Sequence, residues 1–449
     1  MATGSGKTIT ALATVEELYN RVGPPLVIII IAPYLNLVDQ WIREAKTFGL
    51  DPINCSGLSS SWTSSVEMAL YLNQSAARPI LSLVTTNATF AGVSFQRVLG
   101  KLRVRTILIA DEVHNLGARH LRNCLPNRIQ LRLGLSATPE RWMDEEGTEA
   151  VSNFFGTTAF SYRLEDALNC DPPSLSPYIY HPVMVSLAEE EIEEYLEITK
   201  LLARFMVDPR SENLSEATLA LLLRRARLIA CAKEKLSALR TTMYPYRNTF
   251  YNLVYCGDGR VEVEAASVTA SCDVSETPVL RQVDAVTRVL GVELGMNVSS
   301  YTAETSTESR QTLLSDFEKA NKQALVAIRC LDEGVDIPEV RRAFILASGT
   351  NPRQFIQRRG RVLRRTEGKD HAEIFDFVVV PPLEDLDPSS GEFRMLRSLV
   401  EKEMQRVVEF ARLALNGPQA AAQLRPTLGA TDNGLRRNRI CAPPIKFKT

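Results

Sequence analysis

The first eight residues of the chain have the types and spacing of a loop that binds phosphate groups. Gly4 and Gly6, on either side of Ser5, allow backbone N–H groups to close around a polyphosphate. Lys7 can reach the β- and γ-phosphates as a point charge, and the hydroxyl of Thr8 suits a Mg²⁺ ligand. By itself this loop indicates only a nucleotide-binding protein, because kinases, GTPases and motor proteins share it.

Two carboxylates directly follow the apolar run 107–110. Parallel sheets bind their ligands at the carboxyl ends of the strands, and Asp111 and Glu112 are placed at such an edge. We predict that Asp111 holds Mg²⁺ through water and that Glu112 is the base that orients and deprotonates the attacking water. The alternative for an Asp-Glu pair is a solvated strand end, and the phosphate loop upstream argues against it.

Polar residues beyond these carboxylates could relay the state of the site. Ser136 and Thr138 follow another apolar run and could hydrogen-bond the Asp-Glu loop, although they could also cap the next turn. His114 lies two residues after the predicted base. It could couple the nucleotide to a second lobe, and a satisfied structural histidine is the alternative.

These residues need a scaffold that brings them together, and the hydrophobic pattern predicts one. Short β-branched runs alternate with helix-length segments, which predicts parallel sheets covered by helices on both faces. The strands expected in a first lobe are 26–32, 80–84, 106–110 and 131–135. The strands expected in a second α/β lobe are 252–256, 298–302, 324–328, 343–347 and 373–380. The helices expected in this second lobe are 279–290, 308–320 and 351–359.

The stretch between the two lobes has a different pattern. A Pro-rich connector at 170–177 is followed by expected helices at 189–205 and 217–239. Its arginines 224, 225 and 227 could contact nucleic acid, and a solvated helix face is the alternative. We predict four segments: an ATP-binding lobe at 1–162, a helical linker at 163–245, a second lobe at 246–382, and a C-terminal helix with a disordered tail at 383–449.

The composition argues against several classes of protein. The net charge of the 449 residues is −1, so a nucleic-acid contact must come from a local basic groove. The longest apolar run, 26–32, is too short to span a membrane, and no membrane contact is expected. The eight cysteines contain no C-x-x-C pair, which indicates reduced thiols in a cytoplasmic protein rather than a metal site or disulfide framework.

Taken in order, the motifs of the chain resemble those of superfamily 2 helicases of the DExH type. Lobe 1 resembles the family at motif I (2–8), motif Ia (32–41), the nucleic-acid-contacting segment 85–90, motif II (111–114) and motif III (136–138). Lobe 2 resembles it at motif V (332–338) and motif VI (357–364). The Gln-Trp that ends motif Ia, the phrase Leu175-Ser-Pro-Tyr and the ending of motif VI are similar to XPB-like and type III restriction-like DNA translocases.

The resemblance implies two RecA-like lobes that bind ATP and Mg²⁺. It places Gly334 and Asp336 of motif V beside the nucleotide. Gln357, Arg361 and Arg364 of motif VI are spaced four and three residues apart, which predicts one helical face. Two guanidinium groups on that face can point together at a γ-phosphate and neutralise the charge that develops during phosphoryl transfer.

The resemblance also implies contacts with nucleic acid. It assigns these contacts to Pro33, Gln40, Thr85 and Thr86, together with backbone amides. Such contacts hold phosphates rather than base edges, so binding should be independent of sequence.

We therefore predict an ATP-dependent helicase or translocase with double-stranded DNA as its expected partner. One alternative is an ATP-gated motor subunit of a restriction or repair assembly, with its nuclease on another chain. Another is a catalytically silent fragment that binds partners. A phosphate loop normally follows a buried strand, so we also expect an N-terminally truncated chain in which ATP hydrolysis is weak.

Overall fold

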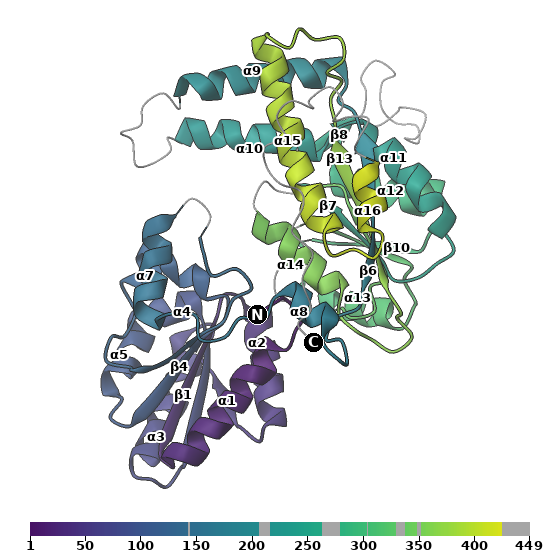
Figure 1. The fold of residues 1–449 in the computed structure, drawn as a ribbon. Helices are drawn as coiled ribbons and strands as arrows, with labels where there is room; N and C mark the ends of the chain where they lie inside the picture. Colours follow the sequence, from purple (N-terminus) through teal and green to yellow (C-terminus); the bar gives the residue numbers. More distant parts are fainter. Residues whose placement is uncertain are drawn as a thin grey trace, which may run out of the picture. The chain divides into compact units, whose positions relative to one another are not determined.

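The computed structural model shows a chain that divides into two compact units (Figure 1). The structure describes residues 1–141, 144–205, 216–262, 279–302, 304–328, 337–347 and 352–423. Of these, lobe 1 contains residues 1–176, 337–338 and 353–366, and lobe 2 contains the others. Each lobe is built around one parallel sheet, as the alternation of strands and helices predicts.

The sheet of lobe 1 has five parallel strands in the order β2-β3-β1-β4-β5. Its strands are β1 (Leu26–Ala32), β2 (Pro52–Asn54), β3 (Ile80–Thr86), β4 (Arg105–Ala110) and β5 (Leu131–Gly134). The helices are α1 (Lys7–Val22), α2 (Leu35–Thr47), α3 (Thr63–Gln74), α4 (Asn87–Ala91), α5 (Val93–Lys101), α6 (Arg119–Arg122), α7 (Glu145–Phe155), α8 (Leu164–Asn169) and α14 (Pro352–Val362). The four predicted strands are present, and β2 extends the sheet by one short strand.

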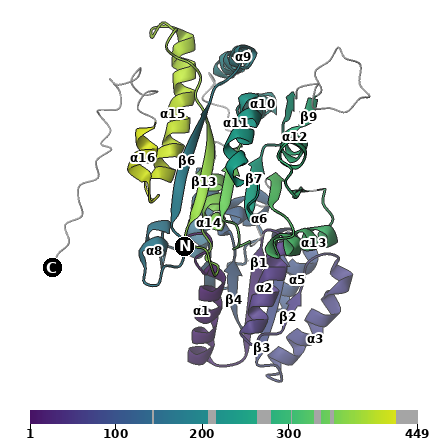
Figure 2. The same cartoon turned by 90° about the vertical axis from the view of Figure 1, so that its right-hand side faces the viewer.

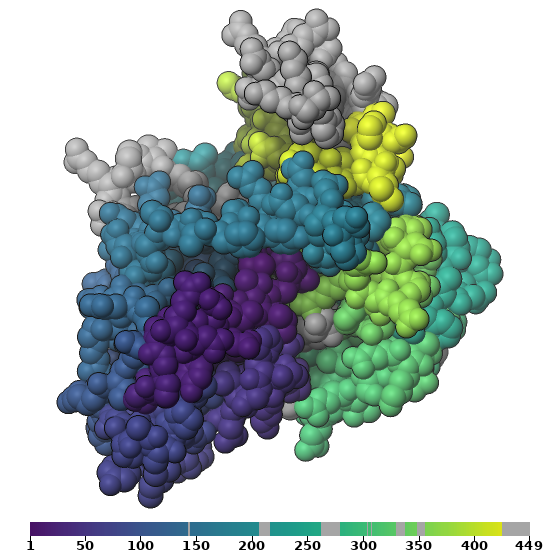
Figure 3. Space-filling view, turned by 60° about the horizontal axis from the view of Figure 1, so that its bottom comes forward, coloured from purple at the N-terminus to yellow at the C-terminus, as the bar shows by residue number. Residues whose placement is uncertain are grey.

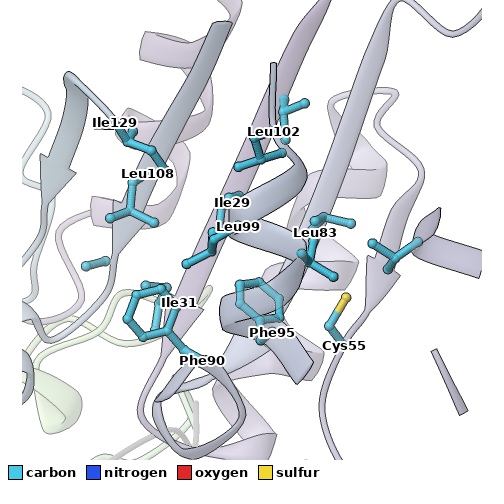
Figure 4. Packing of buried hydrophobic residues seen from close by; sticks show 14 of the residues in the cluster. Ile29, Ile31, Cys55, Leu83, Phe90, Phe95, Leu99, Leu102, Leu108 and Ile129 are labelled. Carbon is cyan, nitrogen blue, oxygen red and sulfur yellow. The ribbon is translucent and has the colours of Figure 1, made fainter. Parts of the chain in front are cut away.

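Strand β1 is fully buried because helices cover both faces of this sheet. Side chains alternate between the two faces of a strand, so Ile29 and Ile31 contact a different core from Ile28 and Ile30. Figure 4 shows Ile29 and Ile31 in the core that Phe95 and other residues of α5 complete. Burial on both faces explains the continuous apolar run that the sequence shows.

The register of this sheet brings the functional loops to one edge. Ala32 at the end of β1 pairs with Thr86 at the end of β3, and Ile31 pairs with Ala110 at the end of β4. The backbone N–H of Asp111 donates to the carbonyl of Ile31 at 2.8 Å. The loops that follow β1, β3 and β4 therefore begin side by side.

The sheet of lobe 2 has six parallel strands in the order β10-β11-β7-β12-β13-β6. Its strands are β6 (Tyr178–Val185), β7 (Asn252–Cys256), β10 (Val298–Tyr301), β11 (Ala324–Ile328), β12 (Arg342–Ile345) and β13 (Ala372–Val379), and a separate antiparallel pair is β8 (Arg260–Glu262) and β9 (Val279–Arg281). The helices are α9 (Glu189–Phe205), α10 (Glu216–Ala230), α11 (Glu234–Met243), α12 (Gln282–Arg288), α13 (Thr307–Glu318), α15 (Gly391–Ala411) and α16 (Gly417–Ala422). All five strands predicted for this lobe are present.

Two details of lobe 2 differ from the predictions. The stretch 163–245 is predicted to be a helical linker with a Pro-rich connector, but β6 lies within it and forms the edge of the sheet. An edge strand tolerates Pro182 and buries only part of its side chains, so its sequence pattern is weak. The helix predicted from residue 279 begins at Gln282, because 279–281 pair with β8. The C-terminal helix predicted within 383–449 is present as α15, which begins at Gly391.

Helix α15 packs on this sheet through buried charges as well as apolar side chains, and Figures 1 and 2 show it alongside β13 and β6. The guanidinium of Arg406 donates to Glu403 at 2.8 and 2.9 Å and to Asp376 of β13 at 2.9 Å. Tyr180 of β6 donates its hydroxyl to the same oxygen of Asp376 at 2.9 Å. Helix α15 is therefore part of the core of lobe 2. Within the described ranges, no helix combines the length and apolar composition needed to cross a bilayer.

Candidate nucleotide-binding site

The phosphate loop forms the turn into helix α1, whose atoms lie on the surface of lobe 1 in Figure 3 (darkest purple). Gly4 and Gly6 adopt φ values of 81° and 87°, a left-handed conformation in which other residues are strained. Gly6 caps the 16-residue α1 without a side-chain hydrogen bond to the first turn. Ser5 donates its hydroxyl back to the carbonyl of Ala2 at 2.8 Å, which holds the loop closed. Because no side chain caps the first turn of α1, its N–H groups can donate to a phosphate group.

Lys7 at the start of α1 faces the predicted base. Its Nζ lies 3.9 Å from Oε1 of Glu112, and both side chains are only 12% exposed. The other carboxylate oxygen of Glu112, Oε2, is buried and accepts no hydrogen bond from any described residue. A buried acceptor without a donor costs free energy, and a bound water would satisfy it.

The backbone of Glu112 is also unusual. Its φ of 43° and ψ of 52° place it in the left-handed region, which non-glycine residues rarely adopt. Such strain persists only where the surrounding structure enforces it, and it is concentrated at functional sites. Here the backbone is fixed on both sides of Glu112: Asp111 N–H donates to the carbonyl of Ile31 at 2.8 Å, and Val113 N–H donates to the carbonyl of Leu135 at 2.9 Å.

Asp111 is held by two hydrogen bonds, one to each carboxylate oxygen. Oδ2 accepts from the indole Nε1 of Trp41 at 2.9 Å, and Oδ1 accepts from the backbone N–H of Glu112 at 2.9 Å. Burial raises the pKa of Asp111 and the neighbouring Glu112 raises it further, while Lys7 and the two hydrogen bonds act in the opposite direction. A positive ion at this carboxylate would relieve the cost of burying it.

His114 contacts Glu112 on one side and Ser136 on the other. Nδ1 of His114 lies 3.5 Å from Oε2 of Glu112 and 3.2 Å from the hydroxyl oxygen of Ser136. That hydroxyl oxygen accepts from the backbone N–H of Thr138 at 3.1 Å. Arg141 donates to the carbonyl of His114 at 2.5 Å. The predicted coupling residues therefore form a continuous series of contacts that begins at Lys7.

The residues at this edge fit a nucleotide with Mg²⁺. Mg²⁺ is usually held in such sites by one or two protein oxygens, with water and phosphate oxygens completing its shell. Thr8 in the first turn of α1 and Asp111 are the residues that would hold the ion here, directly or through water. Across the part of the chain that the structure describes, no group of three or more His, Cys, Asp or Glu side chains could hold a metal by itself.

Motif VI lies only partly on a helix. Gln357 and Arg361 are in α14, but Arg364 lies beyond its end and forms an isolated bridge with Leu175. The prediction of one helical face for all three residues is therefore wrong, because the helix ends at residue 362. Within lobe 1, Arg364 still lies beside the phosphate loop: its Cγ is 3.0 Å from the position that a Cβ atom would take on Gly4. Motif V residues Gly334 and Asp336 lie outside the described residues.

The residues expected to contact nucleic acid differ in accessibility. Pro33 and Gln40 are partly exposed. Thr85 is fully buried and donates its hydroxyl to the carbonyl of Cys55 at 3.3 Å, so its side chain is not at the surface. Thr86 caps α4 by accepting from the N–H of Thr89 at 3.2 Å.

The three arginines of α10 have partners within the protein. Arg224 pairs with Glu194 at 2.7 Å and Arg227 lies 3.4 Å from Asp258. The guanidinium of Arg225 lies 5.9 Å from the ring centre of Tyr195. These contacts favour the alternative of a solvated helix face.

Two residues of this site had no predicted role. Trp41 was identified only as the end of motif Ia, and Arg141 was not identified at all. A signal for Trp41 exists, because a tryptophan on the apolar face of a helix usually needs an acceptor for its N–H. The sequence offers no comparable signal for Arg141.

Two family models match separate parts of the chain. Residues 1–141 match the model described as type III restriction enzyme, res subunit. Residues 273–366 match the helicase conserved C-terminal domain. The two matches fall on the sequences of the predicted motifs I to III and V to VI.

Individual proteins are similar over most of the chain. DNA 3'-5' translocase XPB2 of Sulfurisphaera tokodaii is 25% identical over 371 residues, which cover 82% of this chain and 74% of that protein. Uncharacterized protein ML1624 of Mycobacterium leprae is 25% identical over 422 residues, 88% of this chain and 60% of that protein. A solved structure of the ATP-dependent type ISP restriction-modification enzyme LlaBIII bound to DNA has a TM-score of 0.57 at 15% identity. That match covers 92% of this chain but only 29% of the enzyme, and it shows a shared fold.

Proposed function

Because the chain belongs to the superfamily 2 helicases, with two RecA-like lobes, we propose that it hydrolyses ATP to move along double-stranded DNA. One observation carries this proposal. Glu112 is held in a strained conformation opposite Lys7, and its buried Oε2 accepts no hydrogen bond from the described residues, with Nδ1 of His114 3.5 Å away. A general base needs such an open acceptor for the water that it activates.

Each residue of the site has a separate part in the proposed reaction. The N–H groups of Gly4, Ser5 and Gly6 bind the phosphates, and Lys7 supplies a positive charge at the β- and γ-phosphates. Glu112 orients the water and accepts its proton at Oε2. Thr8 and Asp111 would hold Mg²⁺, which neutralises charge on the phosphate oxygens when it is bound.

Residues of motifs III, V and VI complete the proposal. Gln357, Arg361 and Arg364 stabilise the charge of the transition state, and Gly334 and Asp336 bind the nucleotide. His114, Ser136 and Thr138 relay the state of Glu112 through the contacts described above. The lobes would close when ATP binds and reopen after hydrolysis, and this cycle would move the chain along DNA.

We propose DNA as the nucleic acid along which the chain moves, because XPB2, which matches 82% of this chain, is described as a DNA translocase. Pro33 and Gln40 follow the strand end that also positions Asp111, so they are the proposed phosphate contacts of lobe 1. Thr86 is buried and its hydroxyl caps α4, so it would contribute by holding the start of that helix in place. Binding through phosphates predicts affinity that is independent of sequence and falls steeply with salt.

A second candidate is the motor subunit of a restriction assembly. It is favoured by the match of residues 1–141 to a restriction-enzyme model and by the shared fold with a type ISP enzyme. Stimulation of ATP hydrolysis by duplex DNA in the isolated chain would favour an autonomous motor. Hydrolysis without any response to DNA would favour a subunit that needs a partner.

The decisive experiment compares Glu112→Gln with the wild-type chain. The variant should bind ATP but hydrolyse it about 10²- to 10⁴-fold more slowly, which is the usual contribution of a general base. Glu17→Gln is a matched control, because Glu17 is 61% exposed and its partner among the described residues is Arg21 on the surface of α1. Steady-state ATP hydrolysis with and without duplex DNA measures the effect. Equal rates for Glu112→Gln and Glu17→Gln would show that Glu112 is not the base.

A further inference from the structure

Helix α2 contributes one polar atom to the nucleotide site, the indole Nε1 of Trp41. Trp41 is 1% exposed, and its N–H reaches across 70 residues of sequence to Oδ2 of Asp111 at 2.9 Å. We propose that Trp41 is a positioning residue that sets the orientation of the Asp111 carboxylate for Mg²⁺. This inference rests on the proposed function, in which Asp111 holds that ion.

The two hydrogen bonds fix the carboxylate without neutralising it. Trp41 and the backbone N–H of Glu112 each occupy one oxygen of Asp111, so the carboxylate cannot rotate about its Cβ–Cγ bond without breaking one of them. Both donors are uncharged, and each oxygen keeps a second lone pair. The negative charge therefore remains available to a cation, whereas a lysine or arginine in place of Trp41 would compensate it.

Packing also fixes the indole ring of Trp41, in addition to the hydrogen bond that its Nε1 makes. Trp41 lies in the buried core that α2 shares with Leu12 of α1 and Ile30 of β1. Groups that orient the ligands of a metal in this way typically change metal affinity by about 10- to 100-fold when they are lost. The orientation of Asp111 therefore depends on the position of α2 in this core.

The position of Trp41 in α2 gives this contact a second consequence. Helix α2 begins at Leu35, directly after Pro33 and Tyr34, and Gln40 precedes Trp41. Pro33 and Gln40 are the residues proposed to contact DNA. If DNA binding shifts α2, the orientation of Asp111 therefore changes as well. Within lobe 1, this contact couples DNA binding to the proposed Mg²⁺ ligand.

Lobe 1 provides a matched control in Trp62. This residue is 2% exposed and precedes helix α3, and its Nε1 is buried without a hydrogen-bond partner among the described residues. Trp41→Phe and Trp62→Phe make the same chemical change in the same lobe. Only the first removes a donor from Asp111.

The test is a Mg²⁺ titration of DNA-stimulated ATP hydrolysis in the wild-type chain and both variants. Trp41→Phe should raise the Mg²⁺ concentration for half-maximal rate by about tenfold or more, and saturating Mg²⁺ should restore most of the rate. Trp62→Phe should match the wild type. The same Mg²⁺ dependence in both variants would overturn the proposal, since a merely structural role would not separate them.

A second measurement does not depend on hydrolysis. In a chain labelled with ¹⁵N-tryptophan, the indole resonance of Trp41 should shift when Mg²⁺ is added to the ADP-bound protein, and that of Trp62 should stay in place. The two resonances are assigned with the Trp→Phe variants, or with Trp62→Phe and Trp142→Phe if Trp41→Phe does not fold. If the wild-type chain hydrolyses no ATP, the proposed function fails and this spectrum still decides the inference. An unshifted Trp41 resonance would overturn it.

Discussion

The buried charges beneath helix α15 predict a large and localised loss of stability when Arg406 is replaced by methionine. Arg406 is 7% exposed and donates to two carboxylates, Asp376 at 0% exposure and Glu403 at 7%. Glu403 also accepts from the backbone N–H of Val379 at 3.1 Å, so it cannot turn away from the site. The variant would leave two buried carboxylates facing each other without their shared cation.

The size of the effect follows from this arrangement. Removal of one partner from a buried ion pair costs about 3–5 kcal/mol, because the remaining charge stays buried and uncompensated. The buried ammonium of Lys235 lies close enough to interact with both carboxylates and partly compensates their charge. We therefore expect the lower end of that range, about 3 kcal/mol of unfolding free energy.

Arg397 on the same helix is the matched control. It pairs with Glu401 at 2.9 Å, but the two side chains are 33% and 56% exposed. An exposed pair spaced four residues apart on a helix contributes only about 0.3–0.5 kcal/mol, so Arg397→Met should be nearly neutral.

Two optical signals can separate the lobes in a urea titration. All three tryptophans, residues 41, 62 and 142, lie in the sequence of lobe 1, whereas circular dichroism reports helices of both lobes. Arg406→Met should move part of the circular dichroism transition to lower urea and leave the tryptophan fluorescence transition in place. Equal stability of Arg406→Met and Arg397→Met would refute the reasoning, and so would a shift of the fluorescence transition alone.

Three further predictions concern other parts of the molecule. Burial lowers the pKa of Lys235 to about 8, below the usual value of about 10.4. Between these values the unfolded chain binds more protons, so the unfolding free energy of the wild type relative to Lys235→Met should rise from pH 8 to pH 10 in urea titrations. Arg361→Ala and Arg364→Ala should each lower the kcat of DNA-stimulated ATP hydrolysis far more than they raise KM, and an equal change in both would make them ground-state contacts. Asn416 pairs its side-chain amide with the N–H and C=O of Tyr180 on edge strand β6, so Asn416→Ala should increase self-association in size-exclusion chromatography.

The elements of the nucleotide site could be predicted because each depends on local sequence. Strand β1 is buried on both faces, and this requires a continuous apolar run. Parallel strands bring their carboxyl ends to one edge, so the loops at 33, 87 and 111 had to begin near each other. Strand β6 was missed because an edge strand that contains Pro182 lacks both the apolar run and strict alternation.

Contacts between distant residues could not be predicted in the same way. Trp41 and Asp111 are separated by 70 residues, and Arg406 and Asp376 come from different elements of lobe 2. No periodicity relates such residues, because their pairing depends on how the elements pack. The site residues were therefore easier to predict than the residues that orient them.

A sequence still marks where such a partner is needed, even when it cannot say which residue it is. Glu403 and Arg406 lie on the same buried face of α15 as Val400 and Val407, at positions where the helical pattern calls for apolar side chains. A charge on that face must meet an opposite charge in the core, because an unpaired buried ion is too costly. The same logic applies to the N–H of Trp41 on the apolar face of α2. Polar atoms on buried faces thus predict contacts between elements, and in this protein one of them leads to the candidate Mg²⁺ ligand.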